Sequence, residues 1–119
     1  SPDNSSKQLD SIAKLLLKYK VNGVIATNTT IDRKCILNSK YSMEEGGLSG
    51  APLNKKSTNV IKHLNKCLDG KIPIIGVGGI ITADDGIEKI KNGASLIQIY
   101  TGLIFRGHEL VNELRKAIR

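Results

Sequence analysis

The sequence has 119 residues, of which 39% are hydrophobic and 24% charged, a size and composition usual for one globular domain. Its apolar runs, such as residues 72–77, are short and interrupted by Pro or Gly, whereas a membrane-spanning helix needs about 20 apolar residues. The net charge of +7 suggests nucleic-acid binding, but the basic residues are spread along the chain, and three Tyr and one Phe cannot form a base-stacking platform. We therefore expect a solvated basic surface and no nucleic-acid partner.

The two cysteines and two histidines form no recognisable metal motif. Cys35 and Cys67 lie far apart and belong to no CxxC or Cys/His cluster, so we expect free thiols and no metal site. His63 falls on a polar helix position and His108 at a helix start, which predicts surface or capping roles. The opening residues 1–3 lack the basic and then apolar pattern of a signal peptide, so no targeting is predicted from them.

The first predicted elements are a helix and a strand. A capping box formed by Ser5 and Gln8 opens the helix, which continues to about Lys20. Its apolar stripe repeats at helical spacing and comprises Leu9, Ile12, Ala13, Leu16 and Leu17. Residues 21–27 follow as a strand, because their centre is short, apolar and rich in β-branched side chains, as in a strand buried on both faces.

Polar side chains gather directly after this strand, in the run Thr27-Asn28-Thr29-Thr30. The residues that follow have no regular period and end in Gly46-Gly47-Leu48-Ser49-Gly50, and a loop of this length is usually functional. An amide such as that of Asn28 can both donate to and accept from a planar ring. We interpret the run as part of a binding site rather than as a plain polar turn.

The rest of the chain alternates in the same way. A helix after Pro52 stops at Gly70 and has an apolar face of Val60, Ile61, Leu64, Cys67 and Leu68. A strand over residues 72–77 leads to a helix that Thr82 caps and Gly93 closes, with Ile87 and Ile90 expected to face inward.

The last predicted elements are a strand over residues 95–99, a turn over 100–102, a short helical piece over 103–105 and a helix from about His108. The apolar side of that final helix comprises Leu110, Val111, Leu114, Ala117 and Ile118. Strands that alternate with crossover helices predict a parallel α/β sheet, either an open doubly wound sheet or part of a (β/α)₈ barrel. Three strands with both edges bare do not make a finished domain, so we expect residues 1–119 to be a portion of one domain.

Two loops carry the pattern of a phosphate site. Gly76-Val77-Gly78-Gly79 after the second strand lets the backbone approach an anion, although a tight turn uses the same glycines. Tyr100-Thr101-Gly102 follows the next strand and precedes a short helix, an arrangement in which (β/α)₈ barrels bind phosphate. Ser49 lacks a nucleophile elbow and is expected to make only a backbone or hydroxyl contact. Arg33 and Arg106 are the loop cations best placed to meet an anion, although solvated roles also fit them.

These blocks, in order and with matching spacing, resemble the class 2 dihydroorotate dehydrogenases of the bacterial, membrane-associated type. The resemblance covers essentially the whole chain and rests on residues 1–3, 23–30, 46–50, 74–79 and 93–100. It implies the C-terminal part, about strands 6 to 8, of a (β/α)₈ TIM barrel that binds FMN, oxidises dihydroorotate to orotate in pyrimidine biosynthesis and reduces a quinone. Alternatives are another phosphate-binding barrel enzyme and a small flavodoxin-like binding module.

The resemblance also implies roles for individual residues. Asn28 and Thr29 match the pair that holds the orotate ring. The flavin contacts would be Thr27, Ser49, Gly50, Val77, Gly78, Gly79, Ile99, Tyr100 and Thr101. The family's catalytic serine would lie upstream of residue 1, so no catalytic residue is expected in this chain, and the Cys35 position does not match the cysteine base of class 1 relatives. A missing N-terminal remainder would bring peripheral contact with the cytoplasmic side of the inner membrane.

Overall fold

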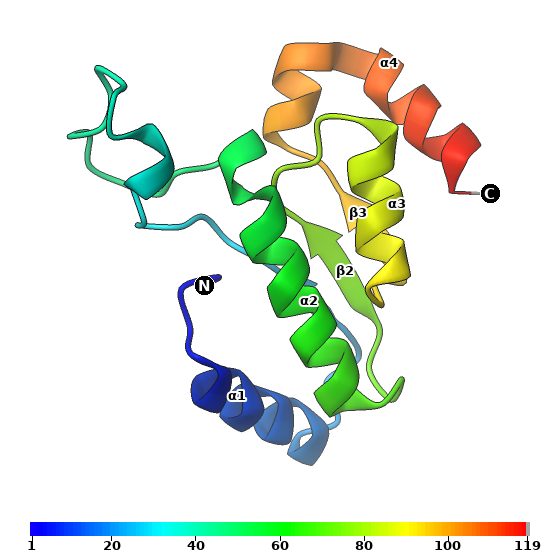
Figure 1. The fold of residues 1–119 in the computed structure, drawn as a ribbon. Coiled ribbons are helices and arrows are strands. Elements are labelled where there is room, and N and C mark those ends of the chain that lie inside the picture. Colours follow the sequence, from blue (N-terminus) through cyan, green and yellow to red (C-terminus); the bar gives the residue numbers. More distant parts are fainter. Residues whose placement is uncertain (119) are drawn as a thin grey trace.

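The structure, a computed structural model, describes residues 1–118. Its sheet has three parallel strands in the order β1 (Val24–Ala26), β2 (Ile74–Val77) and β3 (Leu96–Gln98). The helices within this range are α1 (Ser6–Lys18), α2 (Asn54–Leu68), α3 (Ala83–Lys91) and α4 (Thr101–Ala117), and they alternate with the strands (Figure 1). The predicted order of elements is therefore confirmed. No helix among the described residues is long and apolar enough to span a membrane.

The strands are shorter than the predicted ranges of 21–27, 72–77 and 95–99. Register pairs Val24 with Ile74 and Ile75 with Leu96, and only residues that pair across the sheet belong to the strands. Some flanking residues still bond to a neighbouring strand, since the Thr27 N–H donates to the Val77 carbonyl and the Ser95 N–H to the Ile74 carbonyl, but Pro73 has no N–H with which to extend the ladder.

Both predicted N-caps are present. The Ser5 N–H donates to Oε1 of Gln8 over 2.8 Å, and the Thr82 N–H donates to Oδ2 of Asp85 over 2.8 Å. In α4 the backbone at Gly107 leaves the helical region with φ +60°, so the two helical pieces predicted around this point are two segments of one bent element. His108 is exposed directly after the bend.

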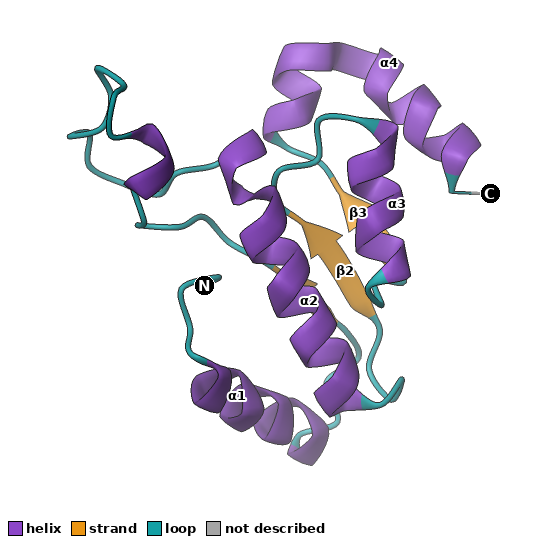
Figure 2. Ribbon diagram, viewed as in Figure 1, coloured by secondary structure: helices purple, strands orange, loops and turns teal. Residues whose placement is uncertain are grey.

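Helices cover one face of the sheet only. Figure 2 shows α2 and α3 in front of the strands, and α1 packs against α2 at one end. The main core between them contains Leu9, Ala13, Ala26, Val60, Ile61, Leu64, Leu68, Ile72, Ile74 and Ala94. On the other face Ile25, Ile75 and Leu96 share one register row, and Ile25 and Leu96 are 57% and 63% exposed. A parallel sheet normally has both faces covered, so this face lacks its partner.

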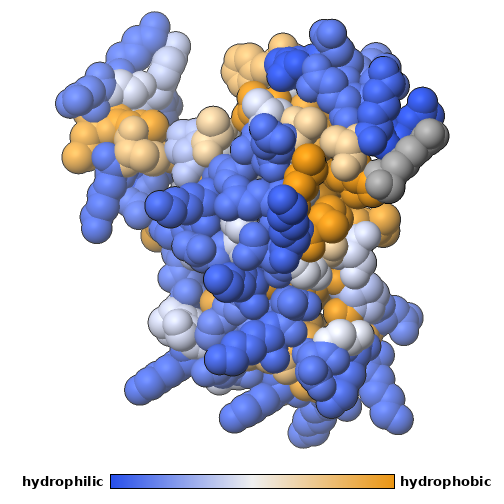
Figure 3. All heavy atoms as spheres, turned by 45° about the vertical axis from the view of Figure 1, so that its right-hand side comes forward, coloured by the Kyte–Doolittle hydropathy of each residue, from blue (hydrophilic) through white to orange (hydrophobic). Residues whose placement is uncertain are grey.

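A second uncovered apolar surface lies between α3, β3 and α4. It is a groove of about 420 Å³ lined mainly by Ile90, Leu96, Ile97, Ile99, Val111, Leu114 and Ile118. Figure 3, which brings this side forward, shows hydrophobic residues gathered below α4. The groove explains why Val111, expected to face inward, is 41% exposed. Ala117, placed on the same side by the sequence, is exposed as well.

The inward face of α3 differs from the prediction. Its buried residues are Gly86 and Lys89, whereas Ile87 and Ile90 are half-buried. Lys89 lies under α2, where its Nζ donates to Oγ1 of Thr58 over 2.6 Å and to the Asn54 carbonyl over 3.0 Å. Burial lowers the pKa of Lys89 to about 8, against the opposing effect of the nearby carboxylates.

Candidate functional site

A cavity of about 440 Å³ lies at the carboxyl ends of the three strands. The loops after β1, β2 and β3 each supply part of its wall, and the segment before α2 completes it. Every residue that the sequence assigned to cofactor or substrate lines this cavity: Thr27, Asn28, Thr29, Ser49, Gly50, Val77, Gly78, Gly79, Ile99, Tyr100 and Thr101. The fold therefore brings together residues as far apart in the sequence as Thr27 and Thr101.

The loop after β2 presents its amide groups to this cavity. Gly78 and Gly79 have φ of +118° and +71°, a region that residues with a Cβ rarely adopt. Their carbonyls are turned toward α2, because Ser57 Oγ donates to the Gly78 oxygen and Asn54 Nδ2 to the Gly79 oxygen, each over 3.0 Å. Since the C=O and the next N–H of a peptide unit point in opposite directions, the N–H groups of Gly79 and Ile80 point away from α2. Within residues 1–118 these two N–H groups have no backbone partner, so they can donate to an anion.

Packing against α2 gives a second reason for these glycines. A Cβ at Gly78 would lie 2.9 Å from Ser57 Oγ, and one at Gly79 would overlap the backbone of Asn54. The glycine pattern thus reflects the backbone conformation and a close helix contact, besides any approach of a ligand.

The start of α4 forms the opposite wall. The first N–H groups of a helix have no partner within the helix and carry the positive end of its dipole. Oγ1 of Thr101 donates to Ser49 Oγ over 3.0 Å, which joins the α4 start to the loop before α2. A Cβ at Gly102 would overlap the Ile80 carbonyl, so glycine there allows α4 and the β2 loop to meet. Together these features can hold a phosphate without a cationic side chain.

One buried polar atom in the cavity has no partner. Oγ1 of Thr27 is buried and forms no hydrogen bond within residues 1–118. Buried hydroxyls in folded proteins are almost always paired, so this group fits a contact to a ligand. With the backbone amides of the two walls, it makes the cavity chemically suited to a phosphorylated ligand.

Asn28 and Thr29 lie together at the mouth of the cavity. The Thr29 N–H donates to Oδ1 of Asn28 over 2.8 Å, which orients the amide, and Nδ2 of Asn28 donates to no atom of the described chain. A Cβ at Gly47 would overlap the Thr29 side chain, so the glycine run of the long loop packs against this pair. The amide is thus held by the protein on one side and open on the other.

A polar cluster anchors the first residues to the same loop. Oδ1 of Asp3 accepts from Thr30 Oγ1 over 2.5 Å and from Lys56 Nζ over 2.6 Å, and Oδ2 accepts from the Ile31 N–H over 3.0 Å. Although partial burial opposes ionisation, these hydrogen bonds hold the pKa of Asp3 well below its ordinary value. The cluster fixes the segment after Thr29.

The two arginines considered for anion binding have other partners. Arg33 donates to the carbonyls of Thr30, Glu44 and Gly46, and thereby closes the long loop on itself. Arg106 donates to the Ile81 carbonyl over 3.0 Å and pairs with Glu113 over 2.8 Å. Neither lines the cavity, and no charged side chain of the described residues does so.

Gly102, part of the predicted phosphate loop, also lines the cavity, together with five residues that the sequence did not assign to it: Ile25, Leu53, Ile80, Ile81 and Gln98. Gln98 is the one that carried a signal, since it is a polar residue within the apolar strand run Leu96-Ile97-Gln98-Ile99. Its register partner is Val77, and both lie on the uncovered face.

The two cysteines and His63 lie outside the cavity. Cys35 is exposed and lies outside the cavity, as expected of a free thiol. The fold brings His63 and Cys67 beside Asp10 of α1, a spatial grouping that is separate from the local sequence motifs considered above.

A three-stranded parallel sheet covered on one face, with a cavity at the carboxyl ends of its strands, is the arrangement found in one part of a (β/α)₈ barrel. The family model described as dihydroorotate dehydrogenase matches residues 1–119. The chain belongs to the dihydroorotate dehydrogenase family.

Relatives and solved structures agree with this assignment. Dihydroorotate dehydrogenase (quinone) of Wigglesworthia glossinidia brevipalpis is 53% identical over 117 residues, which are 98% of this chain and 35% of the relative. The protein of the same name from Nitrosospira multiformis is 51% identical over 118 residues, or 99% of this chain and 34% of the relative. DHODH of Eimeria tenella in complex with ferulenol matches with a TM-score of 0.93 at 36% identity, covering 99% of this chain and 31% of that one. The chain thus spans about a third of the proteins that it matches, and the barrel fold replaces the flavodoxin-like alternative.

Proposed function

We propose that this chain is the C-terminal portion, within one domain, of an FMN-dependent dihydroorotate dehydrogenase. The complete protein would oxidise dihydroorotate to orotate in pyrimidine biosynthesis and pass the electrons to a quinone. One observation carries the proposal, namely that eleven residues from separate loops line a single cavity. The similar proteins with the printed name dihydroorotate dehydrogenase (quinone) support the reaction.

FMN would lie along the cavity with its phosphate between the β2 loop and the start of α4. Gly79 and Ile80 would donate backbone N–H groups to it from the loop that begins at Gly78, and Thr101 would place the first amides of α4 on its other side. Thr27 would give its unpaired hydroxyl to the flavin. The remaining contacts would come from Ser49, Gly50, Val77, Ile99 and Tyr100. When bound, FMN supplies the hydride acceptor, a chemistry that no side chain provides.

Asn28 and Thr29 would position the substrate ring. Thr29 holds the Asn28 amide oxygen, and the open NH₂ group of Asn28 can donate to a carbonyl of orotate. The pair lies at the end of β1, next to Thr27, so a ring bound there would be adjacent to the flavin contact.

The proton removed from C5 of dihydroorotate needs an acceptor that this cavity wall does not supply. No carboxylate, imidazole, thiol or amine is among the described lining residues. Ser49 is engaged by Thr101 on the phosphate side of the cavity. We therefore propose that the base lies outside residues 1–119, and the family resemblance implies that it is a serine in an N-terminal remainder of the same protein. That remainder would also provide peripheral contact with the cytoplasmic side of the inner membrane, where a lipid-soluble quinone is available.

The cofactor released from the purified complete protein tests the proposal. We expect yellow protein that releases FMN on denaturation, identified by chromatography. A colourless protein that retains a sugar phosphate would instead favour another phosphate-binding barrel enzyme.

The substrate contact has its own test in the same protein. Asn28→Ala should lower kcat/KM for dihydroorotate and leave the FMN content near wild type, because its amide contacts the ring. Asn38→Ala in the same loop is the control, since Asn38 is exposed and outside the cavity. Equal activity of the two variants would remove Asn28 from the site.

A further inference from the structure

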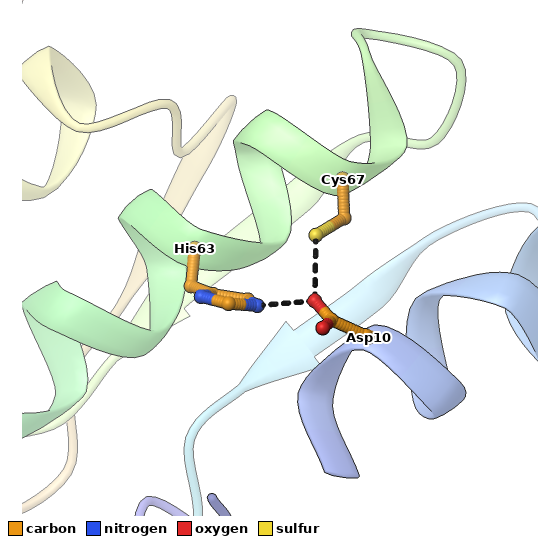
Figure 4. Close-up of side chains that lie close together, drawn as sticks. All are labelled: Asp10, His63 and Cys67. Carbon is orange, nitrogen blue, oxygen red and sulfur yellow. Dashed lines mark hydrogen bonds and ion pairs between the residues drawn. The ribbon is translucent and has the colours of Figure 1, made fainter. Parts of the chain in front are cut away.

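Three potential metal ligands meet where α1 packs against α2, outside the cavity. The Oδ1 atom of Asp10 lies 2.8 Å from His63 Nε2 and 3.4 Å from Cys67 Sγ. One ligand atom from each residue lies within 4.8 Å of the other two. Figure 4 shows His63 and Cys67 projecting from α2 toward Asp10 on α1.

The three side chains meet because they stand on two helices that pack against each other, not on a loop. His63 and Cys67 are four residues apart on a helix, so they share one face. Asp10 follows the buried Leu9 on α1, and both helices contribute to the main core around Leu64 and Leu68. The backbone positions of all three residues are therefore fixed by well-packed helices.

The ligand types select the metal. Zinc binds thiolate sulfur at about 2.3 Å, and imidazole nitrogen and carboxylate oxygen at about 2.0–2.2 Å. Ligand atoms around one tetrahedral zinc ion are then roughly 3–4 Å apart, and the observed separations need only small side-chain rotations to match. Magnesium and calcium prefer sets of oxygen ligands, which this cluster does not offer.

We propose that Asp10, His63 and Cys67 form a three-ligand site for Zn²⁺ that links α1 to α2. On binding, the Cys67 thiol loses its proton to solvent and the sulfur coordinates the ion as thiolate. All three side chains are partly exposed, so the ion has a route in and its fourth position is left to water. Without metal, the same residues form a hydrogen-bonded link between the helices.

Spectroscopic titration with Co²⁺ alone, followed by displacement with Zn²⁺, tests the site in the complete protein. Wild type should develop the near-ultraviolet charge-transfer absorption of a cobalt–thiolate bond with one ion per chain, and zinc should abolish it. Cys67→Ser should lose this absorption, while Cys35→Ser, which alters an exposed thiol elsewhere, should keep it.

Zinc affinity measured by calorimetry gives the second readout. His63→Gln should weaken binding by roughly tenfold or more, because even loss of an outer-shell partner costs about 10–100-fold. His108→Gln is the matched control, since His108 is exposed and remote from the cluster. Absence of the cobalt–thiolate absorption in wild type, or equal zinc affinity in the His63 and His108 variants, would overturn the proposal. If a variant fails to fold, the wild-type cobalt spectrum decides.

Discussion

Thr27 carries a hydroxyl that is buried and unpaired within the described chain, although its backbone N–H is satisfied by Val77 over 2.9 Å. An unpaired buried hydroxyl costs folding free energy, so its presence is explained if the flavin accepts its hydrogen bond. The two effects can be measured separately. The unpaired hydroxyl lowers the stability of the cofactor-free protein, whereas its hydrogen bond to the flavin strengthens cofactor binding.

Replacing Thr27 with Val should therefore have opposite effects on affinity and stability. We expect FMN to dissociate more readily from Thr27→Val by a factor corresponding to about 1 kcal/mol, while the melting temperature of the cofactor-free protein stays equal or rises. Flavin fluorescence on dilution and thermal melting measure the two quantities. Thr27→Ser, which keeps the hydroxyl, should retain FMN, and loss of flavin from both variants would point to packing instead.

Lys89 is a residue whose pKa links stability to pH. Its pKa is lowered to about 8 from an ordinary value of 10.5, chiefly by burial. Between these values the unfolded chain binds a proton at Lys89 that the folded chain does not, so the free energy of unfolding rises with pH through this window. In denaturant titrations, wild type should gain stability relative to Lys89→Met from about pH 8 toward 10.5. A difference that stays flat or falls would show that hydrogen bonds keep Lys89 charged.

Residue-level features were predictable where they depend on neighbours in sequence. The capping boxes at Ser5 and Thr82 involve residues three positions apart, and both are present. The burial of Lys89 and the cluster around Asp10 depend on how α2 packs on α3 and α1, and the residues involved lie 31 to 57 positions apart. No local pattern carries that information.

At the scale of elements, the loop after β2 is shaped by its contact with α2. Gly79 has φ +71° and would place a Cβ against the Asn54 backbone. Gly70 has almost the same φ, +70°, but nothing within 4 Å of its Cβ position. Both glycines therefore have a backbone conformation that disfavours a Cβ, but only at Gly79 would a Cβ also collide with α2.

We expect Gly70→Ala to destabilise the protein by about 1–2 kcal/mol, the cost of placing a Cβ in the left-handed region. Gly79→Ala should cost distinctly more and should also release FMN, because α2 or the loop must move. Thermal melting and bound-flavin content compare the two. Equal losses of stability would mean that the loop relaxes freely and that the α2 contact does not hold it.

Element order followed from hydrophobic periodicity, because helix and strand repeats are local properties. The long loop after β1 was recognised as functional, but its closure by Arg33 and its anchor to Asp3 involve carbonyls and a carboxylate that no pattern marks. The predicted strands were longer than the observed ones, because a strand ends where its residues no longer pair with a neighbouring strand.

At the scale of the whole molecule, the chain is a slab measuring 43 × 35 × 18 Å with one sheet face uncovered. The exposed row Ile25, Ile75 and Leu96 and the groove beside α4 are apolar, and the outer strands β1 and β3 have unpaired edges. In a closed barrel the strand edges are paired, because each strand has two neighbours, and the apolar inner face is covered by the side chains that fill the barrel.

The isolated 119-residue chain should therefore be insoluble or molten, and inactive with any quinone acceptor. Exposed apolar faces and strand edges favour aggregation. Size-exclusion chromatography, near-ultraviolet circular dichroism and a dihydroorotate assay would check this. A soluble monomer that melts cooperatively would mean that the three-stranded unit is self-sufficient, and turnover by it would place a base within the chain.

We propose above all that the cavity at the strand ends binds a flavin that dihydroorotate reduces. The most direct test is anaerobic mixing of the complete protein with dihydroorotate while the flavin absorbance is followed. We expect the absorbance to bleach and to return on addition of a quinone, and we expect Asn28→Ala to slow the bleaching. A bound flavin that stays oxidised in excess dihydroorotate, or a protein without flavin, would contradict it.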